Sequence, residues 1–83
     1  MSNINIRLIE NRRELIFNAP KSVQIVLKEI KKANGRIKMI ELEKKVNYSD
    51  RTIRKCLKYL LDLEIIVKEP DFHDLRSYYL ALA

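Results

Sequence analysis

The sequence has few of the residues that build disulfide-bonded, metal-centred or loop-rich domains. Its 83 residues include one cysteine, one histidine, one glycine, two prolines and no tryptophan. A single thiol cannot form an internal disulfide, and structural zinc sites need several Cys or His ligands. We therefore expect no disulfide, no metal site and no cofactor. Stability must come from packing, within the chain or against a partner chain.

Long apolar runs and targeting signals are missing as well. No stretch approaches the roughly 18 apolar residues that a transmembrane helix requires. Residues 1–5 show no basic segment followed by a hydrophobic one, which is the pattern of a signal peptide. We therefore expect a cytoplasmic protein that has no membrane partner.

The sequence also lacks a recognisable catalytic arrangement. With one glycine there is no glycine-rich phosphate loop, and Glu41 and Glu43 point to different faces of a helix. His73 has no second histidine, cysteine or carboxylate cluster near it and is predicted to be an exposed loop residue. Cys56 is predicted to be a small buried side chain rather than a redox sensor. We expect no enzymatic activity, and no small-molecule effector is evident.

The length of the chain and the distribution of its charge indicate the number of domains and the kind of partner. A chain of 83 residues, 47% of them hydrophobic, is too short to divide its core, so we expect a single domain over residues 1–83. Residues 19–63 carry twelve Lys and Arg against five Asp and Glu, a net charge of +7. Residues 1–18 add +1 and residues 64–83 add −2, which gives the chain its total of +6. A basic helical region of this kind is typical of domains that neutralise phosphates. Lysine-rich helices that are merely well solvated would look the same.

Residues 1–18 form an N-terminal extension whose structure is ambiguous. Ile4, Ile6 and Leu8 alternate as in a strand, and Leu15 and Phe17 continue the alternation after a polar segment, which indicates a hairpin. Leu8, Ile9, Leu15 and Ile16 also fall together at helical spacing, which indicates a helix. We favour a helix. Because the extension is richer in large apolar residues than a minimal domain requires, it is a candidate dimerisation element; extension of the core within one chain is the alternative.

A first core helix is predicted after Pro20, with Asn18 as its cap. Asn34-Gly35 is a strong stop signal at its other end. Its apolar stripe is Val23, Val26, Leu27, Ile30 and Ala33.

Residues 41–66 read as two short helices joined by a tight turn and followed by a strand. Leu42 and Val46 lie on one face of the first helix, and Ile53 and Leu57 on one face of the second. Ser49 or Asp50 can accept hydrogen bonds from the first free amides of the second helix. The face that remains on this second helix, about residues 50–63, is basic and hydroxyl-bearing, as suits a DNA groove.

This pattern resembles the helix-turn-helix of small winged-helix transcriptional regulators from bacteria and archaea, over about residues 20 to 82. The matching positions are Glu41, Leu42, Val46, Asn47, Ser49, Arg51, Thr52, Ile53, Leu57, Leu60, Ile65 and Ile66. The resemblance implies an α+β fold, a three-helix core with a C-terminal β-hairpin wing, and a short strand at Arg36-Ile37. Two positions depart from it. Glu43 replaces a small residue, and Glu64 replaces the usual glycine after the recognition helix, which should end by another device or run slightly longer.

The wing is predicted from two strand-like runs, residues 65–69 and 76–82, separated by a turn-rich interval. Its tip carries Asp71 and Asp74, which phosphates would repel, so Arg76 is the one wing residue expected to contact DNA. Phe72 and Leu75 could wedge between bases, but we favour their packing onto the base of the wing or onto a partner.

Two classes of function follow. The favoured one is a sequence-specific transcriptional regulator that binds double-stranded DNA, as a homodimer, with its recognition helix in the major groove. The alternative is a winged-helix protein-interaction module of a larger transcription, replication or membrane-remodelling assembly. RNA binding is less favoured because no aromatic stacking platform is evident. The candidate DNA-binding residues are Ser49, Arg51, Thr52, Arg54, Lys55, Lys58 and Arg76.

Overall fold

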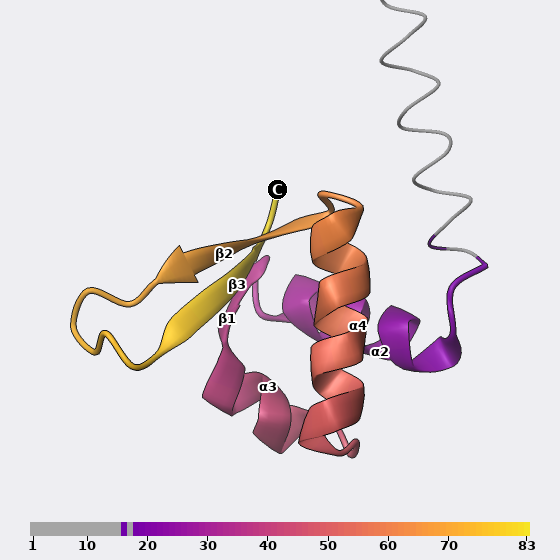
Figure 1. Ribbon diagram of the computed structural model, residues 1–83, viewed down its shortest axis with the longest axis horizontal. Helices are drawn as coiled ribbons and strands as arrows, with labels where there is room; N and C mark the ends of the chain where they lie inside the picture. Colours follow the sequence, from indigo (N-terminus) through magenta and orange to yellow (C-terminus); the bar gives the residue numbers. More distant parts are fainter. Residues whose placement is uncertain (1–15, 17) are drawn as a thin grey trace, which may run out of the picture.

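The computed structural model describes residue 16 and residues 18–83 (Figure 1). The choice between a helix and a hairpin for the N-terminal extension therefore lies outside the described residues. The elements, in chain order, are α2 (Lys21–Lys32), β1 (Arg36–Lys38), α3 (Met39–Lys45), α4 (Asp50–Asp62), β2 (Ile66–Pro70) and β3 (Tyr78–Leu82). No helix in this part of the chain is both long and apolar enough to cross a membrane.

Three helices pack beside a small antiparallel sheet whose strand order is β1-β3-β2. Ile37 pairs with Leu80 across β1 and β3, and Ile66 pairs with Leu82 across β2 and β3. We refer to β2, β3 and the loop of residues 71–77 as the wing, which projects away from the helices (Figure 1). The predicted three-helix core with a C-terminal β-hairpin is confirmed.

Helix α2 contributes its predicted apolar stripe to the core. Val23, Val26, Leu27 and Ile30 are buried, while Ala33 is half-buried. The prediction of Asn18 as the cap is wrong, because Pro20 occupies that position and no side chain caps the helix. Proline suits this place, since it has no amide proton to leave unpaired.

The predicted stop at the end of α2 is confirmed. Asn34 and Gly35 have φ angles of 61° and 84°, and the Gly35 amide donates to the Ile30 carbonyl at 3.0 Å. Gly35 also lies against the end of β3, where an added Cβ would stand 3.3 Å from Leu82 Cδ1. This turn therefore leads the chain directly into β1.

The turn after α4 is closed by Glu64 rather than by a glycine. Glu64 adopts a left-handed φ of 58°, its amide donates to the Leu61 carbonyl, and the Ile65 amide donates to the Leu60 carbonyl, both at 3.0 Å. These two bonds satisfy the last carbonyls of the helix in the manner of a glycine-terminated helix. The expectation of a different device or a longer helix is therefore wrong, because Glu64 takes the conformation that glycine would take.

The core lies between α2, α3, α4 and the inner face of the sheet. Its fully buried larger side chains are Ile30, Ile37, Leu42, Ile53, Leu60, Ile66, Leu80, Val26 and Cys56. Burial of Cys56 agrees with its predicted structural role. Ile16 and Ile25 are partly buried and pack against this core, so the start of the described chain reaches it.

Candidate nucleic-acid interface

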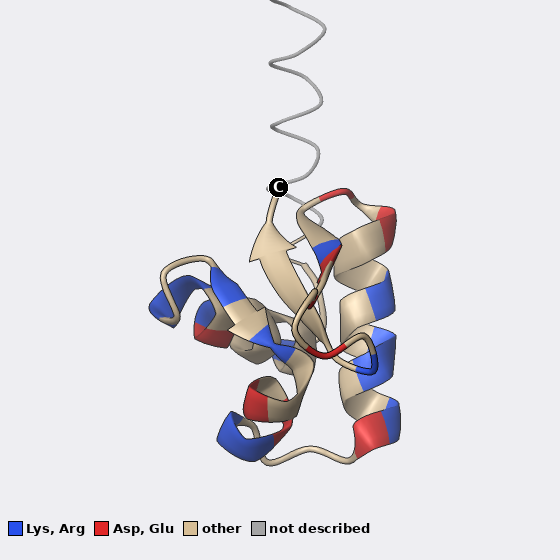
Figure 2. Cartoon of the chain, turned by 90° about the vertical axis from the view of Figure 1, so that its left-hand side faces the viewer, with Lys and Arg blue, Asp and Glu red and all other residues tan. Residues whose placement is uncertain are grey.

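Helix α4 separates apolar and basic residues cleanly between its two faces. Ile53, Cys56, Leu57 and Leu60 are buried, because their spacing of three and four residues places them on one side of the helix. The exposed side chains on the opposite face include Arg51, Arg54, Lys55 and Lys58. Lys and Arg segments accordingly follow α4 along most of its length in Figure 2. The fold thus gathers four of the predicted DNA-binding residues on one surface.

Like most lysines and arginines of the described residues, these four cations have no ion-pair partner there. Elsewhere Lys32 pairs with Glu29, and Arg36 pairs with Glu69 at 3.1 Å. An unpaired basic face keeps its full charge for an external anion, whereas a paired cation must first give up its partner.

Of the two candidate caps of α4, Ser49 and Asp50, it is Ser49 that caps the helix. Ser49 Oγ accepts a hydrogen bond from the Thr52 amide at 3.2 Å and donates one to Thr52 Oγ1 at 3.0 Å. This arrangement satisfies one of the free amides of the first turn. Both hydroxyl groups are therefore already engaged, so a nucleic acid would share them with the cap.

One of the two aspartates of the wing tip is buried rather than exposed. Asp71 is 2% exposed, and its Oδ2 lies 3.2 Å from Lys38 Nζ at the end of β1. Its Oδ1 accepts a hydrogen bond from the His73 amide at 3.0 Å. The prediction that Asp71 would repel phosphates from the tip is therefore corrected, because this carboxylate is buried and paired.

The pKa values of the buried pair shift in the directions that an ion pair requires. The hydrogen bond from the His73 amide lowers the pKa of Asp71, Lys38 lowers it further, and burial of the carboxylate opposes both. The pKa of Lys38 is raised, chiefly by its hydrogen bond and charge interaction with Asp71. Both groups are consequently charged at neutral pH, and their charges offset each other.

Arg76, the predicted wing contact, extends into solvent. Its side chain is 94% exposed, and its Nε lies 3.5 Å from Asp74 Oδ1. The same carboxylate oxygen accepts the Arg76 amide at 3.1 Å. Asp74 thus offsets the charge of Arg76, which leaves this arginine a weaker anion contact than the unpaired cations of α4.

Phe72 and Leu75 do not pack onto the base of the wing, contrary to that part of the expectation. They are 84% and 82% exposed at the tip. His73, between them in sequence, is exposed as predicted.

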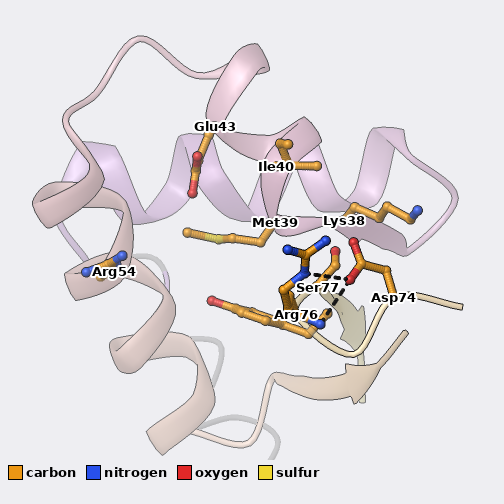
Figure 3. A pocket seen from close by; sticks show the side chains of 9 residues that line it. Lys38, Met39, Ile40, Glu43, Arg54, Asp74, Arg76 and Ser77 are labelled. Carbon is orange, nitrogen blue, oxygen red and sulfur yellow. Dashed lines mark hydrogen bonds and ion pairs between the residues drawn. The ribbon is translucent and has the colours of Figure 1, made fainter. Parts of the chain in front are cut away.

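A groove of about 700 Å³ separates α4 from the wing, with α3 along its third side (Figure 3). Arg54 stands on the α4 side and Arg76 on the wing side, while Glu43 reaches in from α3. The lining residues are Lys38, Met39, Ile40, Glu43, Arg54, Asp74, Arg76, Ser77 and Tyr78. The groove therefore joins the basic helix and the wing into one concave surface.

Lys38 is the interface residue that the sequence did not reveal. It anchors the wing through Asp71, and its Nζ also lies 5.5 Å from the centre of the Tyr79 ring. Arg36 covers the same ring at 3.9 Å, and Lys68 covers the Tyr78 ring at 4.0 Å. Because cations already occupy these ring faces, the two tyrosines do not form an open platform for base stacking.

Comparison with solved structures finds a mutant of MarR from E. coli in a crystal structure with operator DNA, at a TM-score of 0.72. The match covers 99% of this chain and 62% of the MarR chain, at 17% sequence identity. No protein-family model matches the sequence, and no curated protein matches it. At this identity the likeness concerns the fold: the chain has the winged helix-turn-helix fold that MarR has.

Proposed function

We propose that this chain is a sequence-specific transcriptional regulator that binds double-stranded DNA with α4 in the major groove. The observation that carries the proposal is the basic face of α4, where Arg51, Arg54, Lys55 and Lys58 are exposed and unpaired among the described residues. An α-helix of this kind fits the width of the major groove. The same fold is seen bound to operator DNA in the MarR crystal structure.

The residues divide into two roles by their place on α4. Arg51, Thr52 and Lys55 read base edges, with Arg54 as a further reader, because residues in the first turns of a recognition helix reach deepest into the groove. Ser49, Lys58 and the first amides of α4 hold phosphates. Arg76 adds a weaker contact from the wing, since Asp74 partly neutralises it.

The active species is a homodimer whose two copies of α4 read half-sites about one helical turn apart. The N-terminal extension of residues 1–18 is the proposed dimerisation element. Deletion of residues 1–17 should convert the dimer to a monomer, or cause aggregation through newly exposed apolar surface. Sedimentation that shows the intact chain monomeric at tens of micromolar would rule out this part of the proposal.

Selection from random duplex oligonucleotides with the purified chain tests both the class of function, sequence-specific DNA binding, and the two-fold symmetry of the dimer. Enrichment of an inverted repeat is the expected result, since two symmetric copies read the same half-site on opposite strands. Failure to enrich any duplex would contradict sequence-specific binding. An acidic wing would favour the alternative, a protein-interaction module, but the charge of Asp71 is buried against Lys38.

A further inference from the structure

The tip of the wing presents two large apolar side chains to solvent within four consecutive residues. Phe72 and Leu75 are 84% and 82% exposed, whereas the next most exposed large apolar residue in the described part of the chain, Ile40, is 55% exposed. An exposed apolar side chain forgoes the favourable free energy that its burial would provide. Two of them on one projecting loop therefore mark a contact with something outside the chain.

The loop that carries them is braced by its two aspartates. Asp71 accepts the amide of His73 at 3.0 Å, and Asp74 accepts the amide of Arg76 at 3.1 Å, so each carboxylate closes a short turn. Lys38 ties the first turn to β1. Phe72 lies within the first turn and Leu75 within the second. The conformation of the tip is thus fixed before a partner binds, which lowers the conformational entropy that is lost on binding.

The carboxylates of the wing are also electrically neutralised. Asp71 pairs with Lys38, Asp74 with Arg76, and Glu69 with Arg36. Because each of these acids has its own cation, the tip can approach phosphates without strong repulsion. What the tip offers to a partner is therefore its two apolar side chains rather than a charge.

A protein partner would need more surface than this tip supplies. An aromatic side chain buries about 150 to 250 Å², whereas a stable protein interface buries roughly 800 Å² on each partner. Of the remaining exposed apolar residues, Val67 and Leu82 lie on strands away from the loop, and Ile40 lies on the α3 side of the groove. By contrast, one or two apolar side chains suffice to open a base step in the minor groove.

We propose that Phe72 and Leu75 form an apolar wedge that enters the DNA minor groove beside the major groove occupied by α4, and there partly unstacks one base step. This inference rests on the proposed function. The groove that Arg54 and Arg76 flank would take the phosphate strand that separates the two DNA grooves, although Glu43 and Asp74 also line it. Pyrimidine–purine steps unstack most easily, so the wedge makes the chain prefer TA or CA at this position without any hydrogen bond to a base.

The test uses the full chain and the duplex enriched by selection, with 2-aminopurine substituted at one adenine at a time. Because unstacking raises 2-aminopurine fluorescence, the wild-type chain should produce a rise at one step flanking the half-site, and a bend of about 20° or more. Phe72→Ala and Leu75→Ala should abolish the rise. Phe72→Ala should also weaken binding by about 5- to 150-fold, the range measured for base–aromatic stacking, with the salt dependence unchanged.

His73→Ala is the matched control, since it changes an exposed side chain of the same loop and retains the amide that Asp71 accepts. It should behave as the wild-type chain does. A wild-type complex with no fluorescence rise and no bend, or wild-type affinity in Phe72→Ala, would overturn the wedge while leaving DNA binding by α4 intact. Loss of self-association in Phe72→Ala would also overturn it, in favour of a protein contact. Absence of duplex binding by the wild-type chain would instead refute the proposed function itself.

Discussion

Arg51 and Leu57 lie on opposite faces of α4, so substitution of each tests a different property. Leu57 is buried in the core and Arg51 is exposed. If Arg51 makes paired hydrogen bonds to a guanine edge, Arg51→Ala should cost roughly 1 to 3 kcal/mol in cognate binding and relax the preference at one base position. Folding should hardly change, because the side chain has no partner among the described residues.

Leu57→Ala should instead lower the free energy of unfolding by about 2 to 5 kcal/mol, since it removes a buried side chain and leaves a cavity. That is a large share of the stability of a small domain. Binding titrations and thermal melts on both variants separate the two effects. If Arg51→Ala unfolds the chain and Leu57→Ala leaves it intact, the assignment of the faces of α4 is wrong.

Among the elements, α4 ends on a residue in an unfavourable backbone conformation. A left-handed φ costs an L-residue roughly 1 to 2 kcal/mol, and Glu64 has a φ of 58°. Glu64→Gly should therefore be more stable than Glu64→Ala by about 1 kcal/mol. Alanine is the proper reference, because it removes the glutamate side chain but keeps the Cβ that disfavours this conformation. Equal denaturation midpoints for the two variants would show that the turn does not store this strain.

The wing is held to β1 by a pair whose strength depends on pH. Because the pKa of Asp71 is lowered in the folded chain, its contribution to stability is present above the ordinary carboxyl pKa and is lost as the pH falls through the lowered one. An NMR titration of the His73 amide should therefore report a pKa below the ordinary value of 3.8. Asp71→Asn should abolish that titration.

Lys38→Met separates the part of the pKa lowering that Lys38 causes from the part that backbone hydrogen bonds cause. The hydrogen bond from the His73 amide is the larger cause and survives the substitution, so part of the lowering should remain. A pKa at or above the ordinary value in the wild-type chain would show that burial of the carboxylate outweighs its partners, and that the wing is not anchored as described.

Local signals predicted most of the elements, but they missed the contacts that connect distant segments. The stop at Asn34-Gly35 and the cap at Ser49 depend on near neighbours in sequence, and both were found. The partner of Asp71 is Lys38, on a different strand of the sheet. No local pattern reveals such a pair. The sequence therefore predicted that Asp71 would repel phosphates, whereas its charge is buried against Lys38.

The left-handed Glu64 was missed for a related reason. Residue preference argues against this conformation, but packing of α4 and β2 on either side requires a sharp turn there. Of the candidate site, the exposed cations of α4 followed from helical spacing alone. The exposure of Phe72 and Leu75 did not, because apolar residues in a short hairpin loop usually find a place to pack.

For the whole molecule, we expect the basic face of α4 to bind duplex DNA by displacing counterions. Equilibrium binding of the full chain to the selected duplex, measured over a range of salt concentrations, tests it most directly. With about five phosphate contacts, the logarithm of the binding constant should fall against the logarithm of salt with a slope of roughly −4 to −5. Lys58→Ala should make the slope shallower by about one and weaken cognate and random DNA by similar factors. A slope near zero, or no duplex binding even at low salt, would contradict the account.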